Sequence, residues 1–288
     1  EMAVTVGVIG GSGLYHIEGL EDPQDVVVET PFGNPSDVFH TGTLHGVKLV
    51  FLARHGKGHK VLPHELNYRA NIWGFKNLGC KWIIAVTAVG SLREEIVPGH
   101  IVLPDQLIDR TNGRQSTFFG EGVAAHVGFG TPYSDQLRAA LAASCEALGI
   151  TYHNGGTLVT MNGPAFSTKA ESHMYRSWGA NIIGMTALPE AKLVREAEMG
   201  YASLALATDY DCWHESEEDV TAEAVGKIVA SNVARAKQII SHTIPAIVGF
   251  ADEPCHTVLD HAIMTDKAVI PQQTLTNLRP ILQRVLQL

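Results

Sequence analysis

The sequence predicts an α/β fold with a central, mostly parallel sheet flanked by helices. Apolar runs with the length of buried strands occur at residues 4–9, 47–53, 82–86 and 201–207, and amphipathic segments separate most of them. Three of these runs end in glycine beside a hydroxyl, a guanidinium or an imidazole, which is typical of the ligand-binding strand ends of an open sheet. No repeat, low-complexity tract or Gly/Ser linker divides the chain, so we expect one domain over residues 1–288.

The composition indicates a globular protein and excludes several classes of partner. With 288 residues and 45% hydrophobic content, the chain can bury a large core. Its net charge of −9 argues against nucleic-acid binding, and no apolar stretch approaches the ~20 residues that cross a bilayer. The N-terminal segment lacks the basic and apolar regions of a signal peptide. We therefore expect a soluble cytoplasmic protein that binds neither nucleic acid nor membranes.

The turn after the first strand has the composition of an anion site. Gly10, Gly11 and Gly13 surround Ser12, and glycines let a backbone expose its N–H groups to phosphate. An ordinary tight turn explains the same residues equally well. The pattern differs from the dinucleotide motif Gly-x-Gly-x-x-Gly and no helix pattern follows it, so we do not expect a Rossmann dehydrogenase.

The second and third strands end in further candidate phosphate ligands. Arg54 and His55 follow the second strand, and a guanidinium offers a rigid fork that grips phosphate oxygens with two hydrogen bonds. Thr87 and Ala88 follow the third strand. Three strand ends of this kind that converge would form an anion cradle at one edge of the sheet.

A metal site is the weaker alternative at the second strand end. His55, His59 and His64 are close in sequence, but two glycines loosen their spacing and the expected carboxylate or cysteine partners are missing. The four cysteines stand far apart without a Cys-x-x-Cys pair, so we expect reduced thiols and no zinc ligands. We therefore predict no metal.

Helical periodicity and capping residues predict the remaining elements. These are helices over residues 65–78, 134–148, 169–178, 189–199, 221–242 and 273–288 (the last with a kink at Pro280), and a strand over 152–161. Ser134 is a predicted N-cap, and Thr168 with Glu171 is a predicted capping box. Residues 105–133 are glycine-rich and irregular, which is typical of a lid or a subunit contact. His126 lies there, where an ordinary surface histidine is the simpler interpretation.

Two carboxylates mark the end of the last buried strand. Asp209 and Asp211 are two residues apart, and side chains alternate along a strand, so both should project to one side. Capping of the next helix explains them as well. In the functional interpretation, burial raises the pKa of one acid, which then exchanges a proton with a ligand. Phe166, in a Gly-Pro turn, is a candidate for stacking on a flat base, although a core position is the simpler interpretation.

Long ordered motifs extend over nearly the whole chain. They are Gly10-Gly-Ser-Gly13, Thr30-Pro-Phe-Gly-Asn-Pro-Ser-Asp37, Leu52-Ala-Arg-His-Gly56, Tyr68-Arg-Ala-Asn-Ile-Trp73, Gly90-Ser-Leu-Arg-Glu-Glu95, Asp105-Gln with Ile108-Asp-Arg-Thr111, Glu171-Ser with Arg176-Ser-Trp-Gly179, and Ala207-Thr-Asp-Tyr-Asp-Cys-Trp213. In these motifs the chain resembles the purine nucleoside phosphorylases, and within that family it is most similar to the methylthioadenosine phosphorylases. The resemblance implies one nucleoside phosphorylase domain, a partly barrel-like mixed sheet, and assembly as a homotrimer.

The resemblance also implies phosphorolysis, in which inorganic phosphate attacks C1′ of the ribose of 5′-methylthioadenosine and adenine leaves. It makes Asp209 the acid at N7 of the purine and puts Asp211 near the 6-amino group. The implied phosphate positions are Ser12, Arg54, His55, Thr87, Ala88 and Thr186, and the other substrate positions are Phe166, Ser167, Met185, Ala222 and Val225. His126 matches a residue that reaches a neighbouring subunit's site. Phosphate is a co-substrate, and no cofactor is implied.

Three positions depart from the pattern of the methylthioadenosine group. Ser12 stands where Thr is usual, Gly184 where Asn is expected, and Ala222 where Val is usual. The smaller Ala222 predicts a looser 5′ pocket that also accepts adenosine and 2′-deoxyadenosine. Gly184 resembles the 6-oxopurine branch, so cleavage of inosine or guanosine is the alternative, although that branch favours Asn at the position of Asp209. A nucleoside-binding protein without turnover is a further alternative, and a nuclear location stays open beside the cytoplasmic one.

Overall fold

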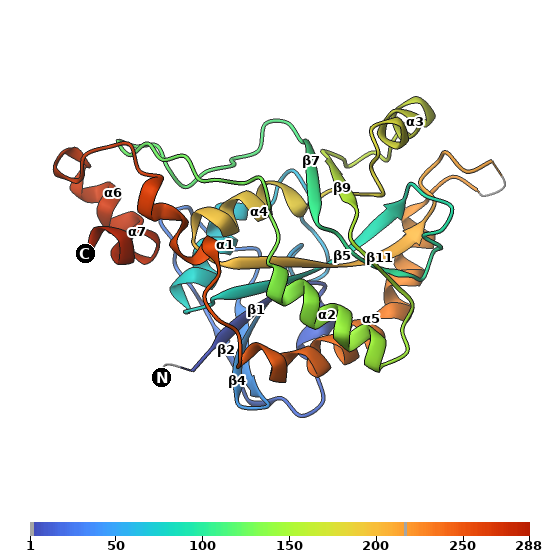
Figure 1. Cartoon of the computed structure of the whole chain (residues 1–288), viewed down its shortest axis with the longest axis horizontal. Coiled ribbons are helices and arrows are strands. Elements are labelled where there is room, and N and C mark those ends of the chain that lie inside the picture. Colours follow the sequence, from blue (N-terminus) through green and yellow to red (C-terminus); the bar gives the residue numbers. More distant parts are fainter. Residues whose placement is uncertain (1–2, 216–217) are drawn as a thin grey trace.

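A forked, eleven-stranded mixed sheet forms the centre of the molecule (Figure 1). The computed structural model describes residues 3–215 and 218–288. The strands are β1 (Thr5–Gly10), β2 (Glu21–Val26), β3 (Phe39–Leu44), β4 (Val47–Ala53), β5 (Trp82–Ser91), β6 (Ile101–Leu103), β7 (Gln106–Arg110), β8 (Tyr152–Asn154), β9 (Thr157–Met161), β10 (Ile182–Gly184) and β11 (Gly200–Asp209). They are ordered β2-β3-β4-β1-β5-β10-β9-β7, with a branch from β5 through β11 and β6 to β8.

Both parallel and antiparallel pairings occur in this sheet. Among the described residues, six strand pairings are parallel and four are antiparallel. The parallel pairs β4–β1, β1–β5 and β5–β11 form its middle, so four strands end at the same edge. The predicted α/β fold with a mostly parallel mixed sheet is confirmed.

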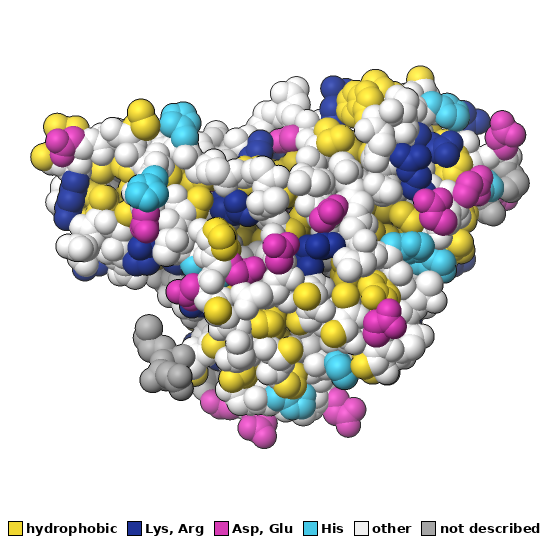
Figure 2. Space-filling model, in the orientation of Figure 1, with side chains coloured by type: hydrophobic (Ala, Val, Ile, Leu, Met, Phe, Trp, Pro, Cys, Tyr) yellow, Lys and Arg dark blue, Asp and Glu magenta, His cyan; other side chains and the backbone are white. Residues whose placement is uncertain are grey.

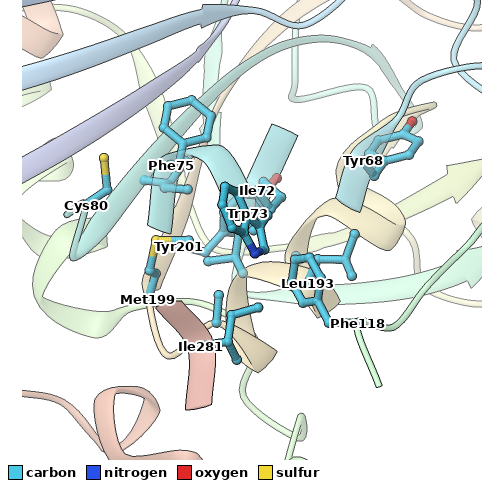
Figure 3. Packing of buried hydrophobic residues seen from close by; sticks show 14 of the residues in the cluster. Tyr68, Ile72, Trp73, Phe75, Cys80, Phe118, Leu193, Met199, Tyr201 and Ile281 are labelled. Carbon is cyan, nitrogen blue, oxygen red and sulfur yellow. The ribbon is translucent and has the colours of Figure 1, made fainter. Parts of the chain in front are cut away.

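Helices cover both faces of the sheet. They are α1 (Tyr68–Asn77), α2 (Asp135–Ala147), α3 (Lys169–Ser177), α4 (Ala187–Glu196), α5 (Ala222–Ile247), α6 (Gln272–Asn277) and α7 (Arg279–Leu286), with 3-10 helices η1 (Ser12–Tyr15), η2 (Pro254–His261) and η3 (Lys267–Val269). Alternation along β5 separates two cores, because Ile83 packs with α1 and α4 whereas Ile84 packs with α2 and α5. Figure 3 shows part of the first core, where Trp73, Tyr201 and Leu193 lie close together.

Local capping begins three helices where the sequence predicts. The hydroxyl of Ser134 accepts from the Leu137 N–H at the start of α2. Thr168 and Glu171 form both hydrogen bonds of the predicted capping box before α3. Thr221 caps α5, which continues to Ile247 rather than stopping near residue 242. These predictions succeed because each cap depends on residues within one turn.

Several element boundaries differ from the prediction. The strand predicted over 152–161 is two strands, because Gly155 and Gly156 have φ of 104° and 121° and turn the chain between β8 and β9. β5 continues past residue 86 to Ser91, where it pairs with β10. Gly90 permits this, since a Cβ there would lie 2.9 Å from the carboxylate of Asp209.

The helical and irregular segments also need corrections. Asn67 caps α1 by accepting from the Ala70 N–H, so this helix begins three residues later than predicted. Residues 105–133 are not wholly irregular, because they contain β7. The C-terminal segment breaks at Leu278 into two helices, α6 and α7, and Pro280 lies in the first turn of α7 instead of kinking one long helix.

The rest of residues 105–133 forms a long loop beside the C-terminal segment, at the left of Figure 1. Figure 2 shows Lys and Arg side chains gathered near α3, with acidic side chains spread over the rest of that face. In the described part of the chain, no helix combines the length and the apolar character needed to cross a membrane.

Candidate active site

A cavity of about 570 Å³ lies at the carboxyl ends of β1, β4, β5 and β11. The first half of α5 and the turns that follow β9 and β10 complete its lining. The carboxyl ends of strands in an α/β sheet are the usual place for a ligand, and the volume suits a small molecule. The convergence of strand ends that the sequence predicts is therefore present.

The glycine turn after β1 lines one end of this cavity. Gly10, Gly11 and Gly13 contribute to the wall, whereas the side chain of Ser12 is exposed and lies outside the lining. A Cβ on Gly10 would approach Leu14 to 2.5 Å, so close packing requires glycine at this position. Ser12 begins η1.

Arg54 lies at the same end but is bound differently from the expectation. Its Nε and Nη2 donate to the two carboxylate oxygens of Glu190 at 2.9 and 3.0 Å, and its Nη1 donates to the carbonyl of Val86. Burial alone would lower the guanidinium pKa, but the charge of Glu190 outweighs it and holds that pKa above its ordinary value. The fork that was expected to grip phosphate is thus occupied, leaving only the remaining N–H bonds for an anion.

Glu190 is a site residue that the sequence analysis missed. It is fully buried and also accepts from the hydroxyl of Tyr201 at 2.8 Å. A charged residue inside the apolar segment that begins α4 was the available signal, since a buried carboxylate needs a partner. Its partner Arg54 is 136 residues away, which no local pattern reveals.

His55 presents a neutral ring to the cavity. Burial, and next the charge of Arg54, lowers its pKa to about 4. Its Nδ1 is 2.9 Å from the carbonyl of Val61, which can only accept, so the proton lies on Nδ1 and Nε2 offers a lone pair. The ring stacks on His59 with centroids 4.2 Å apart.

His55, His59 and His64 do not bring three donor atoms close together, so the structure gives no geometric support to the metal alternative. Within the described residues, the one group of three possible ligands with suitably close donor atoms is Glu253 with Cys255 and His256. That group already has structural partners, because the carboxylate of Glu253 accepts from a tryptophan and a serine side chain and the two ring nitrogens of His256 contact backbone.

The middle of the cavity is lined by residues from β5 and the turn after β10. Thr87 and Ala88 lie within β5 rather than after it, and both contribute to the wall. Met185 and Thr186 join them from the turn before α4. Thr186 is buried, and its hydroxyl makes no cap bond to α4, so it is available to a ligand.

Asp209 and Asp211 line the other end of the cavity. Asp209 accepts from the Thr208 hydroxyl and from the Asp211 N–H, both at 2.7 Å. Because β11 ends at Asp209 and Asp211 has φ of 54°, a turn brings both carboxylates to the cavity, not strand alternation. Burial raises the pKa of both acids, partly offset by hydrogen bonds that favour the charged form.

Phe166 and Met185 border the space beside these carboxylates. Phe166 is 40% exposed and lines the cavity, so the simpler interpretation of a core position is wrong. A Cβ on Gly163 would lie 2.6 Å from the sulfur of Met185, so the two turns pack directly. Ser167 is next to Phe166 but does not line the cavity, and its carbonyl accepts from the Cys212 thiol.

One face of α5 forms an apolar wall. Ala222 and Val225 lie on it as expected, and Gly226, Val229 and Val233 extend it at helical spacing. The second half of the helix, from Ala236 onward, packs in the core.

His126 does not reach the cavity of its own chain. Its side chain is exposed on the long loop, and its N–H donates to the carbonyl of Ala262. The isolated chain therefore brings together every predicted site residue except Ser12, Ser167 and His126.

A family model described as the phosphorylase superfamily matches residues 5–245, from β1 into α5. The chain belongs to this superfamily. The matched residues include the four strand ends, the turn before α4 and the apolar wall of α5. The cavity thus lies within the part of the chain that defines membership of the phosphorylase superfamily.

Curated members of the phosphorylase superfamily are similar over nearly the whole chain. S-methyl-5′-thioadenosine phosphorylase of Geobacter sulfurreducens is 59% identical over 274 residues, which covers 95% of this chain and 96% of that protein. The protein of the same name from Synechocystis sp. is 51% identical over 281 residues, with 96% and 86% covered.

Solved superfamily structures share the fold. Methylthioadenosine phosphorylase from an antarctic soil metagenomic library is 43% identical, with a TM-score of 0.93 and coverage of 98% of this chain and 99% of that one. A variant of adenosine/methylthioadenosine phosphorylase from Schistosoma mansoni, in complex with methylthioadenosine, is 36% identical, with a TM-score of 0.79 and coverage of 86% and 93%.

Proposed function

We propose that this protein is a glycosyltransferase that cleaves 5′-methylthioadenosine with inorganic phosphate, giving adenine and 5-methylthioribose 1-phosphate. The observation that carries the proposal is one cavity with raised-pKa carboxylates at one end and a glycine turn, Arg54 and His55 at the other. The similarity to S-methyl-5′-thioadenosine phosphorylases over almost the full length supports the same activity. A role in purine salvage follows from the product adenine.

Asp209 acts as the general acid in this reaction. A purine anion leaves poorly, so protonation at N7 lowers the barrier, typically by 10²–10⁴-fold. Burial raises the pKa of Asp209 and so favours the protonated form that can donate. After transfer, the Thr208 hydroxyl and the Asp211 N–H stabilise the new carboxylate. Asp211 accepts a hydrogen bond from the 6-amino group of the purine.

The phosphate binds at the opposite end, where it attacks C1′ and balances the positive charge that develops on the ribose. Its ligands are the hydroxyls of Thr87 and Thr186, the backbone of the glycine turn around Ser12 and at Ala88, the free N–H bonds of Arg54, and Nε2 of His55. Because Nε2 carries no proton, its lone pair accepts a hydrogen bond from a phosphate or ribose hydroxyl. No metal or organic cofactor is required.

The remaining walls select the nucleoside. Phe166 stacks on the purine, and Met185 packs beneath the ribose. Ser167 follows Phe166 directly but does not line the cavity, so it acts on the base only through the turn that it shares with Phe166. Ala222 and Val225 face the 5′ substituent, because this wall is apolar and a thioether needs no hydrogen bond. The small side chain of Ala222 leaves room for a 5′-hydroxyl, so adenosine and 2′-deoxyadenosine are also substrates.

The active assembly is a homotrimer in the cytoplasm. His126 is exposed and lies outside its own cavity, which fits a contribution to the neighbouring subunit's 5′ pocket. Nucleoside and phosphate are the small-molecule partners, without nucleic acid or membrane. The relatives named above give no reason to propose a nuclear location. Light scattering tests the assembly, since a fully active monomer would contradict it.

An ultraviolet assay tests the reaction. Methylthioadenosine should yield adenine only when phosphate is present, whereas equal cleavage without phosphate would indicate a hydrolase. Inosine and guanosine test the 6-oxopurine alternative, for which Gly184 is the favouring observation. Binding of methylthioadenosine without any turnover would instead indicate a nucleoside-binding protein.

A further inference from the structure

The guanidinium of Arg114 joins three segments, two of which border the cavity. Its Nε and Nη2 donate to the side-chain and main-chain oxygens of Asn162, at 3.0 and 2.7 Å. Its Nη1 donates to the carbonyls of Met185 and Leu188, at 2.6 and 2.8 Å, and to the hydroxyl of Tyr68 at 3.0 Å. Arg114 does not line the cavity, so it has no direct part in the chemistry described above.

Two of these segments carry side chains that hold the substrates in the proposed function. Asn162 begins the turn that leads to Phe166, and Met185 is followed directly by Thr186. The turns also pack against each other. Gly163 leaves no room for a side chain, since an added Cβ would lie 2.6 Å from the sulfur of Met185. The spacing between the base-stacking Phe166 and the phosphate ligand Thr186 therefore depends on how these two turns are held together.

The geometry of an arginine suits this task. A guanidinium presents five N–H bonds in fixed directions from three nitrogens, whereas the ammonium of lysine is a single point. The edge of Arg114 formed by Nε and Nη2 binds Asn162, and Nη1 binds the carbonyls of Met185 and Leu188. Hydrogen bonds from a charged donor are stronger than neutral ones, so the carbonyls at these turns are held firmly.

We propose that Arg114 is a positioning residue for both substrates, because it holds the Phe166 turn and the Met185–Thr186 turn at the spacing that purine and phosphate require. The proposal rests on the proposed function of the cavity. A role limited to anchoring the long loop has a different consequence, since it would lower stability without changing the KM for phosphate.

Arg195, on α4, provides a matched control because it contacts the same loop. Its Nη1 and Nη2 donate to the carbonyls of Gly128 and Thr131, so it also fastens the loop to α4. These contacts lie outside the cavity. Loss of either arginine should lower Tm, but only loss of Arg114 should raise the KM for phosphate. Phosphate is the substrate that separates the two, because the loop also carries His126, which is proposed to reach a neighbouring 5′ pocket.

The experiment compares Arg114→Ala, Arg114→Lys and Arg195→Ala with the native enzyme, with methylthioadenosine and phosphate each varied. Arg114→Ala should raise the KM of both substrates and lose about 10²-fold in kcat/KM, because a displacement of about 1 Å has an effect of that size. A low, non-denaturing concentration of guanidinium chloride should restore part of this loss. Arg114→Lys should stay impaired, and Arg195→Ala should keep the native KM for phosphate.

Native KM values in folded Arg114→Ala would overturn the proposal, as would an equal increase in the KM for phosphate in Arg195→Ala. If Arg114→Ala does not fold, titration calorimetry measures the affinity of Arg114→Lys for adenine and for inorganic phosphate. Native affinity for both ligands would then overturn the proposal. If the native protein does not cleave methylthioadenosine with phosphate, the proposed function fails. The same calorimetric comparison then tests Arg114 separately.

Discussion

The two sides of the cavity are built on different physical principles. At the strand ends, buried partners hold each charged group, as Glu190 holds Arg54 and the Thr208 hydroxyl holds Asp209. On the α5 side, the lining is apolar and includes small, exposed residues such as Ala222 and Gly226. Catalysis by polar groups requires that these groups are held in position before the reaction, whereas an apolar wall selects a ligand by its shape. We therefore expect changes at the strand ends to affect rate, and changes on α5 to affect selectivity.

The largest effect should come from Asp209→Asn. An amide cannot give a proton to N7, so kcat/KM for methylthioadenosine and adenosine should fall by about 10²–10⁴-fold. Steady-state kinetics with both nucleosides measures the loss, and inosine should gain some activity. Asp252→Asn is the control, because Asp252 pairs with Lys81 on the surface. Full adenosine turnover by Asp209→Asn would mean that Asp209 is not the acid.

The next largest effect should come from Glu190→Gln, which leaves Arg54 buried without its charge partner. Breaking a buried ion pair from one side destabilises a protein by about 3–5 kcal/mol, and the displaced guanidinium should raise the KM for phosphate. Denaturant unfolding and phosphate kinetics measure the two effects. Glu223→Gln is the control on α5, where an exposed pair with Lys227 should contribute under about 1 kcal/mol. Equal effects of both variants would remove the contrast between the two sides.

A pH experiment separates burial of a carboxylate from catalysis. Glu196 lies outside the cavity and accepts from Thr117 and the Phe118 N–H, and burial raises its pKa from 4.5 to about 7. Between pH 4.5 and about 7, Glu196 is therefore protonated in the folded protein but ionised in the unfolded chain. The resulting stabilisation is full below pH 4.5 and disappears as pH rises through about 7, a change on the order of 3 kcal/mol.

Glu196→Gln should remove this part of the pH dependence. Unfolding free energies measured between pH 4.5 and pH 8 should then vary less than in the native protein, and the pH profile of kcat/KM should keep its shape. Activity should instead fall with rising pH as Asp209 loses its proton. A changed activity profile in Glu196→Gln would contradict this division between stability and catalysis.

The smallest effect is expected from Ala222→Val on the α5 wall. Added apolar surface should favour the methylthio group over a hydroxyl by roughly tenfold, with little change in stability, because a methyl-sized change is worth ~1–3 kcal/mol at most. The measurement is kcat/KM for methylthioadenosine and adenosine in both proteins. If the native enzyme already excludes adenosine by more than ~10⁴-fold, a loose apolar wall is not the selector.

Local sequence was sufficient for much of the fold and part of the site. The bounds of β4, the N-cap Ser134 and the capping box of Thr168 and Glu171 match the prediction. Arg54 and Asp209 were found because each directly follows or ends an apolar strand, and parallel strands share an edge. All of these features depend on residues within a few positions of one another.

Long-range contacts decided what local sequence could not. Glu190 engages Arg54 across 136 residues, and Arg114 reaches Met185 across 71, so neither pairing leaves a trace in any local pattern. The periodicity of α5 is continuous, yet its second half is buried in the core while its first half lines a cavity. An apolar stripe indicates that one face of a helix packs against something. Whether that is the core or a substrate depends on where the rest of the chain leaves space.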